Sequence, residues 1–184
     1  MKKIFCKFFG LAILSAGLIF SGCGGSASEN NATKTVSAKA VQGQFPKFDA
    51  TDLNGEKVTS EIFAQKKITV LNIWGTFCPP CIGEMPELGE WAKNFPADAQ
   101  LVGLVCDVGG ADDAKTVSDA KEILQKADAN FLNIVPSKEI LAYLNTVDAV
   151  PTTIFIDAQG NILGEPIIGA QVQEYKKRLD ELLK

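Results

Sequence analysis

Two cysteines separated by two residues, Cys78 and Cys81, are the side chains with the clearest capacity for chemistry in this chain. A pair at this spacing can bind a metal ion, form a structural disulfide or exchange electrons with another thiol–disulfide couple. A structural zinc site needs about four Cys or His ligands, usually in two close pairs. Since the sequence contains no histidine and no second pair of this kind, it predicts neither a metal site nor another cofactor.

A purely structural disulfide is also a weak interpretation, because a bond across two residues constrains little of the unfolded chain. The redox interpretation fits the position of the pair, after an apolar run and at the first turn of an expected helix. Free N–H groups and the helix dipole favour a thiolate there, so Cys78 is expected to attack and Cys81 to resolve the mixed disulfide. Pro79 and Pro80 lie between them, at helix positions where proline loses no needed donor.

The elements that position this pair follow from the apolar pattern. Two nearly continuous apolar runs, 67–74 and 99–108, predict strands buried on both faces. Asn54-Gly55 predicts a tight hairpin between two short strands. The predicted helices are 79–95, a segment from Asp112 or Asp113 to about Ala127, 138–144 and 171–184, with a helical turn at 60–63; further extended segments lie within 45–60, 131–137 and 151–166.

This order of elements predicts an α/β fold with a mixed central sheet, helices on both faces and an extra N-terminal β-hairpin. The folded domain is expected to span 44–184, without an internal repeat or a second domain, and to be a monomer. Cys106 is expected to be a small buried residue within the second strand.

The N-terminal segment has the pattern of an export signal. Residues 1–22 carry three lysines and then an apolar run of 13 residues, which is shorter than the roughly 20 needed to span a membrane. The sequence Phe20-Ser21-Gly22-Cys23 resembles a bacterial lipobox, which implies that Cys23 is lipidated and anchors the protein to a membrane outside the cytoplasm. An ordinary cleaved signal with an unmodified cysteine is the alternative.

Between this segment and the domain, 24–43 is small and polar, so we expect Cys23 and these residues to form a flexible tether. Removal of residues 1–22 leaves 15 basic and 22 acidic residues, a net charge of −7. Such a chain is a poor candidate for binding nucleic acid.

Two segments carry a resemblance to a known family. The sequence TVLNIWGTFCPPCIGEMPEL resembles the active-site segment of the TlpA/ResA group of thioredoxin-like proteins, with its W-x-x-x-C-P-P-C-x-x-E-x-P pattern. The sequence AVPTTIFIDAQGNI is similar to the group's Val-Pro-Thr followed by an Asp-x-x-Gly hairpin. The resemblance runs from about Phe45 to Lys184 and implies a thioredoxin-like fold with thiol–disulfide oxidoreductase activity.

The resemblance also implies roles for single residues. Pro151 matches the cis-proline beside the cysteine pair, with Val150 and Thr152 next to an extended substrate segment. Glu84 matches the acid three residues after the second cysteine and is expected to help move its proton, although an ordinary solvated glutamate is the alternative. Asn72 stands where many thioredoxins have a buried aspartate, which leaves water or Glu84 to remove the proton of Cys81.

Four more residues are expected to flank the site and contact substrate: Trp74, Phe77, Pro79 and Pro80. For Trp74, simple core packing is the alternative. An ordinary trans proline that begins a strand is the alternative for Pro151.

The resemblance implies a membrane-anchored reductant facing the periplasm or the cell exterior. Its electrons would come from a membrane thiol transporter of the CcdA/DsbD kind and go to protein disulfides, such as those of apocytochrome c or of an oxidised methionine sulfoxide reductase. An oxidase that introduces disulfides is the runner-up, but no room for a large helical insertion exists between Asp107 and Pro151. A peroxidase would need a threonine three residues before the cysteine and a partnering arginine, whereas Thr76 lies two residues before Cys78 and Arg178 is the sole arginine. A binding module without catalysis is the remaining alternative.

Overall fold

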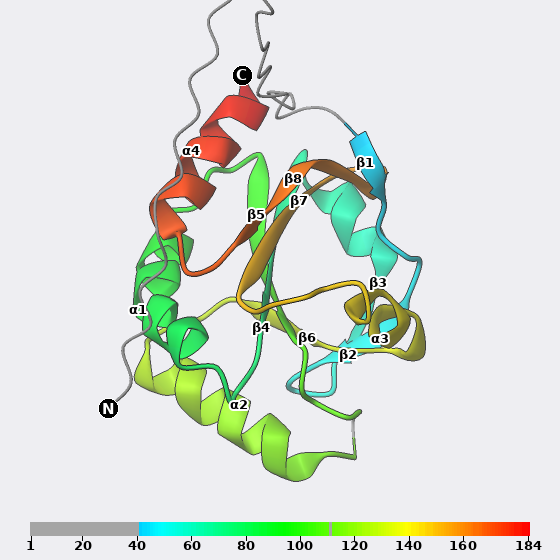
Figure 1. Cartoon of the computed structure of the whole chain (residues 1–184), viewed down its shortest axis with the longest axis vertical. Coiled ribbons are helices and arrows are strands. Elements are labelled where there is room, and N and C mark those ends of the chain that lie inside the picture. The colour runs from blue at the N-terminus through cyan, green and yellow to red at the C-terminus, as the bar shows by residue number, and fades with distance from the viewer. Residues whose placement is uncertain (1–40, 111) are drawn as a thin grey trace, which may run out of the picture. The chain divides into compact units, whose positions relative to one another are not determined.

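The computed structural model describes residues 41–110 and 112–184 of the chain (Figure 1). The predicted signal peptide 1–22, the predicted lipidation site Cys23 and residues 24–40 of the predicted tether lie outside the described residues. Within the described part, none of the helices has the length and apolar character needed to cross a membrane.

One eight-stranded sheet forms the centre of the domain, in the order β1-β8-β7-β4-β5-β6-β2-β3. The central strand β4 runs parallel to β5, and β5 runs parallel to β6, whereas the other neighbours are antiparallel. The predicted mixed sheet with an extra N-terminal hairpin is therefore confirmed. The strands are β1 Val41–Gln44, β2 Asp49–Asp52, β3 Lys57–Thr59, β4 Ile68–Trp74, β5 Ala99–Val105, β6 Leu132–Val135, β7 Thr152–Asp157 and β8 Asn161–Ile168.

Helices cover both faces of this sheet, as predicted (Figure 1). The helices α1 (Pro79–Lys93), α2 (Ala114–Lys126) and α4 (Val172–Leu183) pack on one face. The short helix η1 (Ser60–Gln65) and α3 (Lys138–Leu144) pack on the other. Each face has its own apolar core, because every strand contributes alternate side chains to the two sides.

Strand β4 shows how this alternation positions the site. All seven of its residues are buried. Val70 and Trp74 point into the core under α1 and α4, and Leu71 and Ile73 point into the opposite core. Side chains alternate between the two faces of a strand, so Asn72 lies on the same face as Val70 and Trp74. Its polar side chain is therefore directed into the core beneath α1.

Two boundaries and the burial of one residue differ from the predictions. The tether, predicted as 24–43, ends before Val41, because residues 41–44 form the edge strand β1 paired with β8. The segment has no apolar period, and its position depends on main-chain pairing and on the buried Phe45 that follows. The strand predicted for 99–108 ends at Val105, and Cys106 is half-buried in the turn beyond it rather than enclosed.

The predicted hairpin forms from β2 and β3, but its loop is longer than the two residues predicted. The N–H of Asp52 donates to the carbonyl of Glu56, which leaves three residues in the loop. The last of them is Gly55 at φ 84°, a conformation in which glycine avoids the clash of a Cβ.

Candidate functional site

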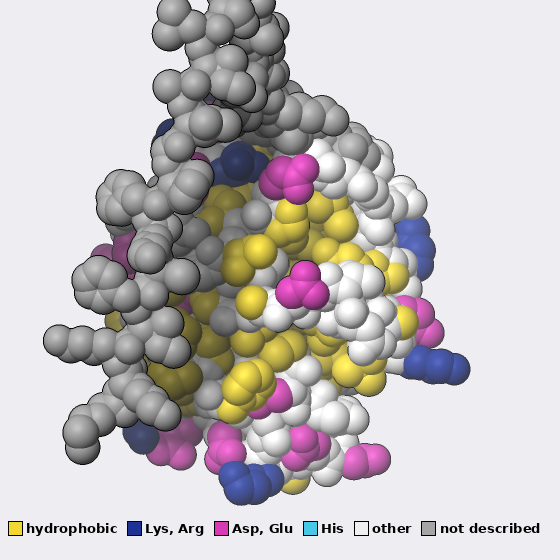
Figure 2. Space-filling model, viewed as in Figure 1, with side chains coloured by type: hydrophobic (Ala, Val, Ile, Leu, Met, Phe, Trp, Pro, Cys, Tyr) yellow, Lys and Arg dark blue, Asp and Glu magenta, His cyan; other side chains and the backbone are white. Residues whose placement is uncertain are grey.

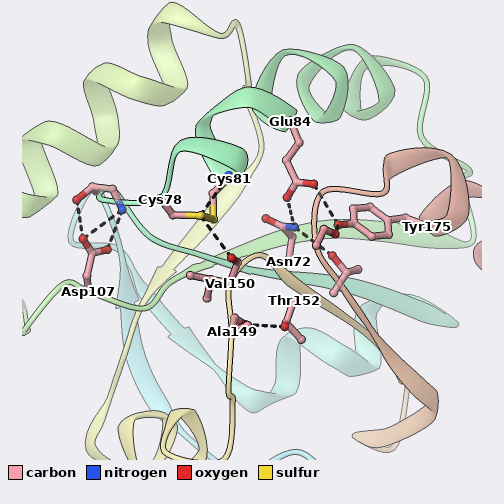
Figure 3. Close-up of a disulfide and its surroundings, with 12 residues drawn as sticks. Asn72, Cys78, Cys81, Glu84, Asp107, Ala149, Val150, Thr152 and Tyr175 are labelled. Atoms are coloured by element: carbon pink, nitrogen blue, oxygen red, sulfur yellow. Dashed lines mark hydrogen bonds between the residues drawn. A yellow bond between two sulfur atoms is a disulfide. The ribbon is translucent and has the colours of Figure 1, made fainter. Parts of the chain in front are cut away.

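The cysteine pair forms a disulfide at the N-terminus of α1, with an S–S distance of 2.09 Å (Figure 3). Cys78 is the N-cap residue, and its Sγ accepts a hydrogen bond from the N–H of Cys81 at 3.2 Å. Both residues are buried, with 4% of Cys78 and 0% of Cys81 exposed. Cys78 retains the small exposed fraction, so a partner can reach the pair from the Cys78 side. There the N–H of Cys81 and the positive end of the helix dipole would stabilise a thiolate on Cys78.

The segment before β7 packs against this disulfide. The Val150–Pro151 peptide bond is cis, as the resemblance implied. The Val150 carbonyl oxygen lies 3.5 Å from Cys78 Sγ, where it can accept a hydrogen bond from the thiol of a reduced Cys78 (Figure 3). The Pro151 carbonyl accepts a hydrogen bond from the N–H of Gly169 at 2.8 Å, which ties this segment to the end of β8.

Two residues predicted to contact substrate are buried instead. Trp74 is 0% exposed, and its indole Nε1 donates to Asn133 Oδ1 at 2.8 Å, so it packs beneath the site, as the alternative interpretation held. Thr152 is also buried, and its hydroxyl donates to the carbonyl of Ala149 at 2.7 Å. Both side chains therefore support the site from within instead of facing a substrate.

Glu84 belongs to a buried polar cluster (Figure 3). Its side chain is 5% exposed, so it is not the solvated glutamate of the alternative interpretation. Asn72 Nδ2 donates to Glu84 Oε1 at 2.8 Å and to Thr153 Oγ1 at 3.1 Å. The Tyr175 hydroxyl lies 3.0 Å from Glu84 Oε2. Burial raises the pKa of Glu84 to about 7, although the hydrogen bonds from Asn72 and Tyr175 oppose the rise.

Tyr175 also contacts the turn that leads into α4. Its hydroxyl oxygen accepts the N–H of Gln171 at 3.1 Å and lies 2.5 Å from the Gly169 carbonyl oxygen. A hydroxyl has one hydrogen, so it can serve Gly169 or Glu84 but not both. If the Tyr175 hydroxyl donates its hydrogen to the Gly169 carbonyl, a protonated Glu84 can donate its own hydrogen to the Tyr175 oxygen, and both short contacts are then hydrogen bonds. The geometry therefore favours the neutral carboxyl, in agreement with its raised pKa.

A second contact holds the loop before the nucleophile. Both carboxylate oxygens of Asp107 lie 3.1 Å from the N–H of Thr76, and Oδ2 accepts the Thr76 hydroxyl at 2.5 Å. These bonds join the turn after β5 to the loop between β4 and α1. This role for Asp107 was not predicted, because the residue fell within the strand expected at 99–108, although an acid near the end of a buried strand was a usable signal.

A groove of about 530 Å³ adjoins the cysteine pair. Phe77 lines it and is 67% exposed, and Pro79 and Pro80, which follow Cys78 in the sequence, are also exposed. Figure 2 shows apolar side chains gathered in the middle of one face of the domain, over β8 and the segment leading into β7. The groove is lined by Phe77, Cys106, Asp107, Leu144, Val147, Asp148, Ala149 and Val150.

Cys106 is a free thiol in this groove. Burial, and then the nearby Asp107, raise its pKa to about 11, so the thiol remains protonated at neutral pH and is a poor nucleophile. Across residues 41–110 and 112–184, no group of three or more His, Cys, Asp or Glu side chains is arranged to hold a metal ion. The redox-capable side chains joined at the site are Cys78 and Cys81, which form the disulfide.

The chain resembles known thiol–disulfide proteins over this region. The AhpC/TSA family model matches residues 41–164, a range that includes both cysteines and the cis bond. A thiol-disulfide oxidoreductase ResA of Bacillus thuringiensis is 32% identical over 143 residues, which cover 77% of this chain and 75% of that protein.

Solved structures show the same thioredoxin-like fold. A thiol:disulfide interchange protein of the thioredoxin family from Chlorobium tepidum superposes with a TM-score of 0.64 at 20% identity, covering 80% of this chain and all of that one. A secreted disulfide oxidoreductase of Mycobacterium tuberculosis, homologous to DsbE of E. coli, has a TM-score of 0.55 at 26% identity, covering 72% and 94% of the two chains.

Proposed function

Because the chain belongs to the AhpC/TSA family and is a thiol-disulfide oxidoreductase of the ResA/DsbE type, we propose that it reduces disulfides in exported proteins while tethered to a membrane. The observation that carries the proposal is the Cys78–Cys81 disulfide at the N-terminus of α1, packed against the cis Val150–Pro151 bond. An apolar groove and the exposed Phe77 adjoin it, which suits an extended segment of a substrate protein.

The reaction begins from the reduced pair. The Cys78 thiolate attacks one sulfur of the substrate disulfide, a mixed disulfide forms, and the other substrate sulfur leaves as a thiolate that takes up a proton. Cys81 then loses its proton and attacks Cys78 Sγ, which releases the second substrate thiol and closes the Cys78–Cys81 bond. Two electrons and two protons pass to the substrate, and an external dithiol must supply both to reduce the pair again.

Single residues have distinct parts in this scheme. Phe77, Pro79, Pro80 and the main chain of Val150 contact the substrate segment, since they are exposed around Cys78 or reach its sulfur. Glu84 lies one turn after Cys81 in α1 and exchanges the proton of that thiol, because a pKa of about 7 permits both protonation states near neutral pH.

The reduction potential tests the direction of electron flow. Equilibration of the pair with a glutathione buffer is expected to give a value near that of thioredoxin, about −270 mV, whereas a value near that of DsbA, about −120 mV, would support the oxidase instead. Among the described residues between Asp107 and Pro151 (107–110 and 112–151), the structure has α2, β6 and α3 and no large helical insertion, which supports the reductase.

Trapping identifies the partners. A Cys81→Ser variant is expected to accumulate mixed disulfides through Cys78, and a Cys78→Ser variant is the matched control that should not. The expected captured proteins are apocytochrome c or an oxidised methionine sulfoxide reductase on the acceptor side, and a CcdA/DsbD-type membrane transporter on the donor side. Equal capture by both variants would contradict the assignment of Cys78 as nucleophile.

Localisation is proposed from the N-terminal sequence. Cys23 is lipidated and holds the domain at a membrane, facing the periplasm or the cell exterior. A Cys23→Ser variant should then lose incorporation of labelled fatty acid and leave the membrane fraction. If the variant keeps the label, the anchor is elsewhere.

A thiol peroxidase finds less support at this site. Arg178 donates to the carbonyl of Glu165 and lies 6.0 Å from the Phe155 ring centroid, so its contacts are with β7 and β8. The Thr76 hydroxyl is bound to Asp107. Consumption of hydrogen peroxide without a thiol partner would revive this alternative.

A further inference from the structure

Asn72 carries the unmatched polar atom of the buried cluster. The residue is 0% exposed, and its Oδ1 has no hydrogen-bond donor among the described protein groups. A buried acceptor without a donor is unusual in proteins and destabilises the state in which it occurs.

The direction of this oxygen is set by the other end of the amide. Both hydrogens of Nδ2 have acceptors, Glu84 Oε1 at 2.8 Å and Thr153 Oγ1 at 3.1 Å. Thr153 lies opposite Asn72 in the β4–β7 register, and Glu84 projects down from α1. With Nδ2 held on that side, Oδ1 points toward the Cys78–Cys81 disulfide (Figure 3).

Cys81 is the group that can supply the missing hydrogen. In the disulfide its sulfur carries none, so the oxidised site has one acceptor in excess. When a dithiol donor delivers two electrons and two protons, the S–S bond breaks and Cys78 and Cys81 each gain an S–H. The Cys78 thiol has its own acceptor, the Val150 carbonyl. The Cys81 thiol is enclosed in the core that contains Val70 and Trp74. These two residues lie on the same face of β4 as Asn72, one on each side of it.

We propose that Asn72 is a positioning residue whose Oδ1 accepts the S–H of Cys81 in the reduced protein, so that reduction supplies the donor that the oxidised site lacks. Asn72 thereby stabilises the reduced pair relative to the disulfide. It also orients the Cys81 sulfur and, by its bond to Glu84, connects that sulfur to the acid. The inference rests on the proposed function only in requiring that the pair cycles between disulfide and dithiol.

The equilibrium with glutathione tests this directly. In an Asn72→Leu variant of the full chain, the reduced state loses its hydrogen bond and the oxidised state loses its unmatched oxygen. The ratio of disulfide to dithiol at fixed glutathione should rise about tenfold, which corresponds to a potential about 30 mV lower. Thr153→Val is the matched control, because it removes a partner of Nδ2 but leaves Oδ1 unchanged, and its ratio should stay within about twofold of the parent.

An unchanged ratio in Asn72→Leu, or equal shifts in both variants, would overturn the proposal. The direction and partners of the cycle do not enter this equilibrium, so either result leaves the reductase proposal standing.

A spectroscopic measurement covers the case in which Asn72→Leu does not fold. Infrared spectra of a Cys78→Ala variant retain the Cys81 thiol, and subtraction of Cys78→Ala/Cys81→Ala isolates its S–H stretching band. A band displaced to the lower wavenumber of a hydrogen-bonded thiol is expected. A band at the position of a free thiol would refute the bond to Asn72.

Discussion

Replacing Glu84 by glutamine should change how the stability of the domain depends on pH. Glutamine has the shape of a protonated glutamate. Its Oε1 can accept from Asn72 Nδ2, and its Nε2 can donate to the Tyr175 hydroxyl, which then donates to the Gly169 carbonyl. The Glu84→Gln variant therefore reproduces the hydrogen bonds of the neutral acid at every pH.

The magnitude follows from the raised pKa of Glu84. Burial raises it from the usual 4.5 to about 7. Between these values the unfolded chain has lost the proton and the folded chain retains it, so the unfolded state binds fewer protons and stability falls as pH rises. At about 1.4 kcal/mol for each pKa unit, the loss reaches about 3 kcal/mol above pH 7. Below pH 4.5 the penalty is absent.

Denaturant unfolding of the oxidised protein at several pH values measures this effect. Glu84→Gln should match the parent near pH 4 and exceed it by about 3 kcal/mol at pH 8. Glu87→Gln is a matched control on the same helix, and because Glu87 is half-exposed its effect should stay within about 0.5 kcal/mol. Parallel curves for Glu84→Gln and the parent would show that the carboxyl is already ionised in the folded state, and the account of the cluster would be wrong.

Two further predictions concern the surroundings of the site. Gly103→Ala would place a Cβ 1.8 Å from Asn133 Oδ1, so denaturant unfolding should show that the free energy of unfolding falls by at least about 3 kcal/mol. In Gly83→Ala the new Cβ meets nothing within 4 Å, and an alanine in α1 should raise the free energy of unfolding by up to about 1 kcal/mol. Similar values for the two variants would contradict the close packing of Gly103 against Asn133. Asp107→Asn should lower the free energy of unfolding by about 1–2 kcal/mol, because Thr76 loses a charged acceptor. It should also slow the exchange of the reduced protein with a small disulfide. An unchanged free energy of unfolding would show that the Thr76–Asp107 hydrogen bonds do not stabilise the fold.

Much of the fold could be predicted from local pattern. Strand β4 and helix α3 follow from an apolar run and an apolar period that coincide with their observed extents to within a residue. Edge strand β1 could not be predicted, because its pairing with β8 uses main-chain groups and leaves no trace in the side chains of Gln42-Gly43-Gln44. The hydrogen-bond partner of the Trp74 indole is Asn133, 59 residues away, and no spacing in the sequence indicates that contact.

The site also contains some residues whose role could be predicted from the sequence and others whose role depends on distant contacts. The redox role of the cysteine pair was predicted from its spacing and its position at the start of a helix, and the cis bond before Pro151 was implied by the family resemblance of the Val-Pro-Thr motif. Tyr175 was predicted only as part of the helix at 171–184, because its hydroxyl contacts Glu84, which lies 91 residues away in the sequence. A tyrosine has an apolar ring and a polar hydroxyl, and its position on a helix does not indicate whether the hydroxyl has a hydrogen-bond partner.

The buried polar cluster of Asn72, Glu84 and Tyr175 lies in a core that is otherwise apolar. The stability of the fold alone does not explain why polar side chains occur there. Asn72 interrupts a strand that is otherwise apolar except for Thr69, and it brings one acceptor more than the oxidised core can satisfy. An apolar residue there would avoid the unmatched oxygen, whereas a redox cycle changes the number of available hydrogens at this point by converting a disulfide into two thiols. The excess acceptor in one state is then the needed acceptor in the other. The raised pKa of Glu84 fits the same logic, since below about pH 7 the carboxyl holds its proton and adds no charge to a core that must accommodate both states.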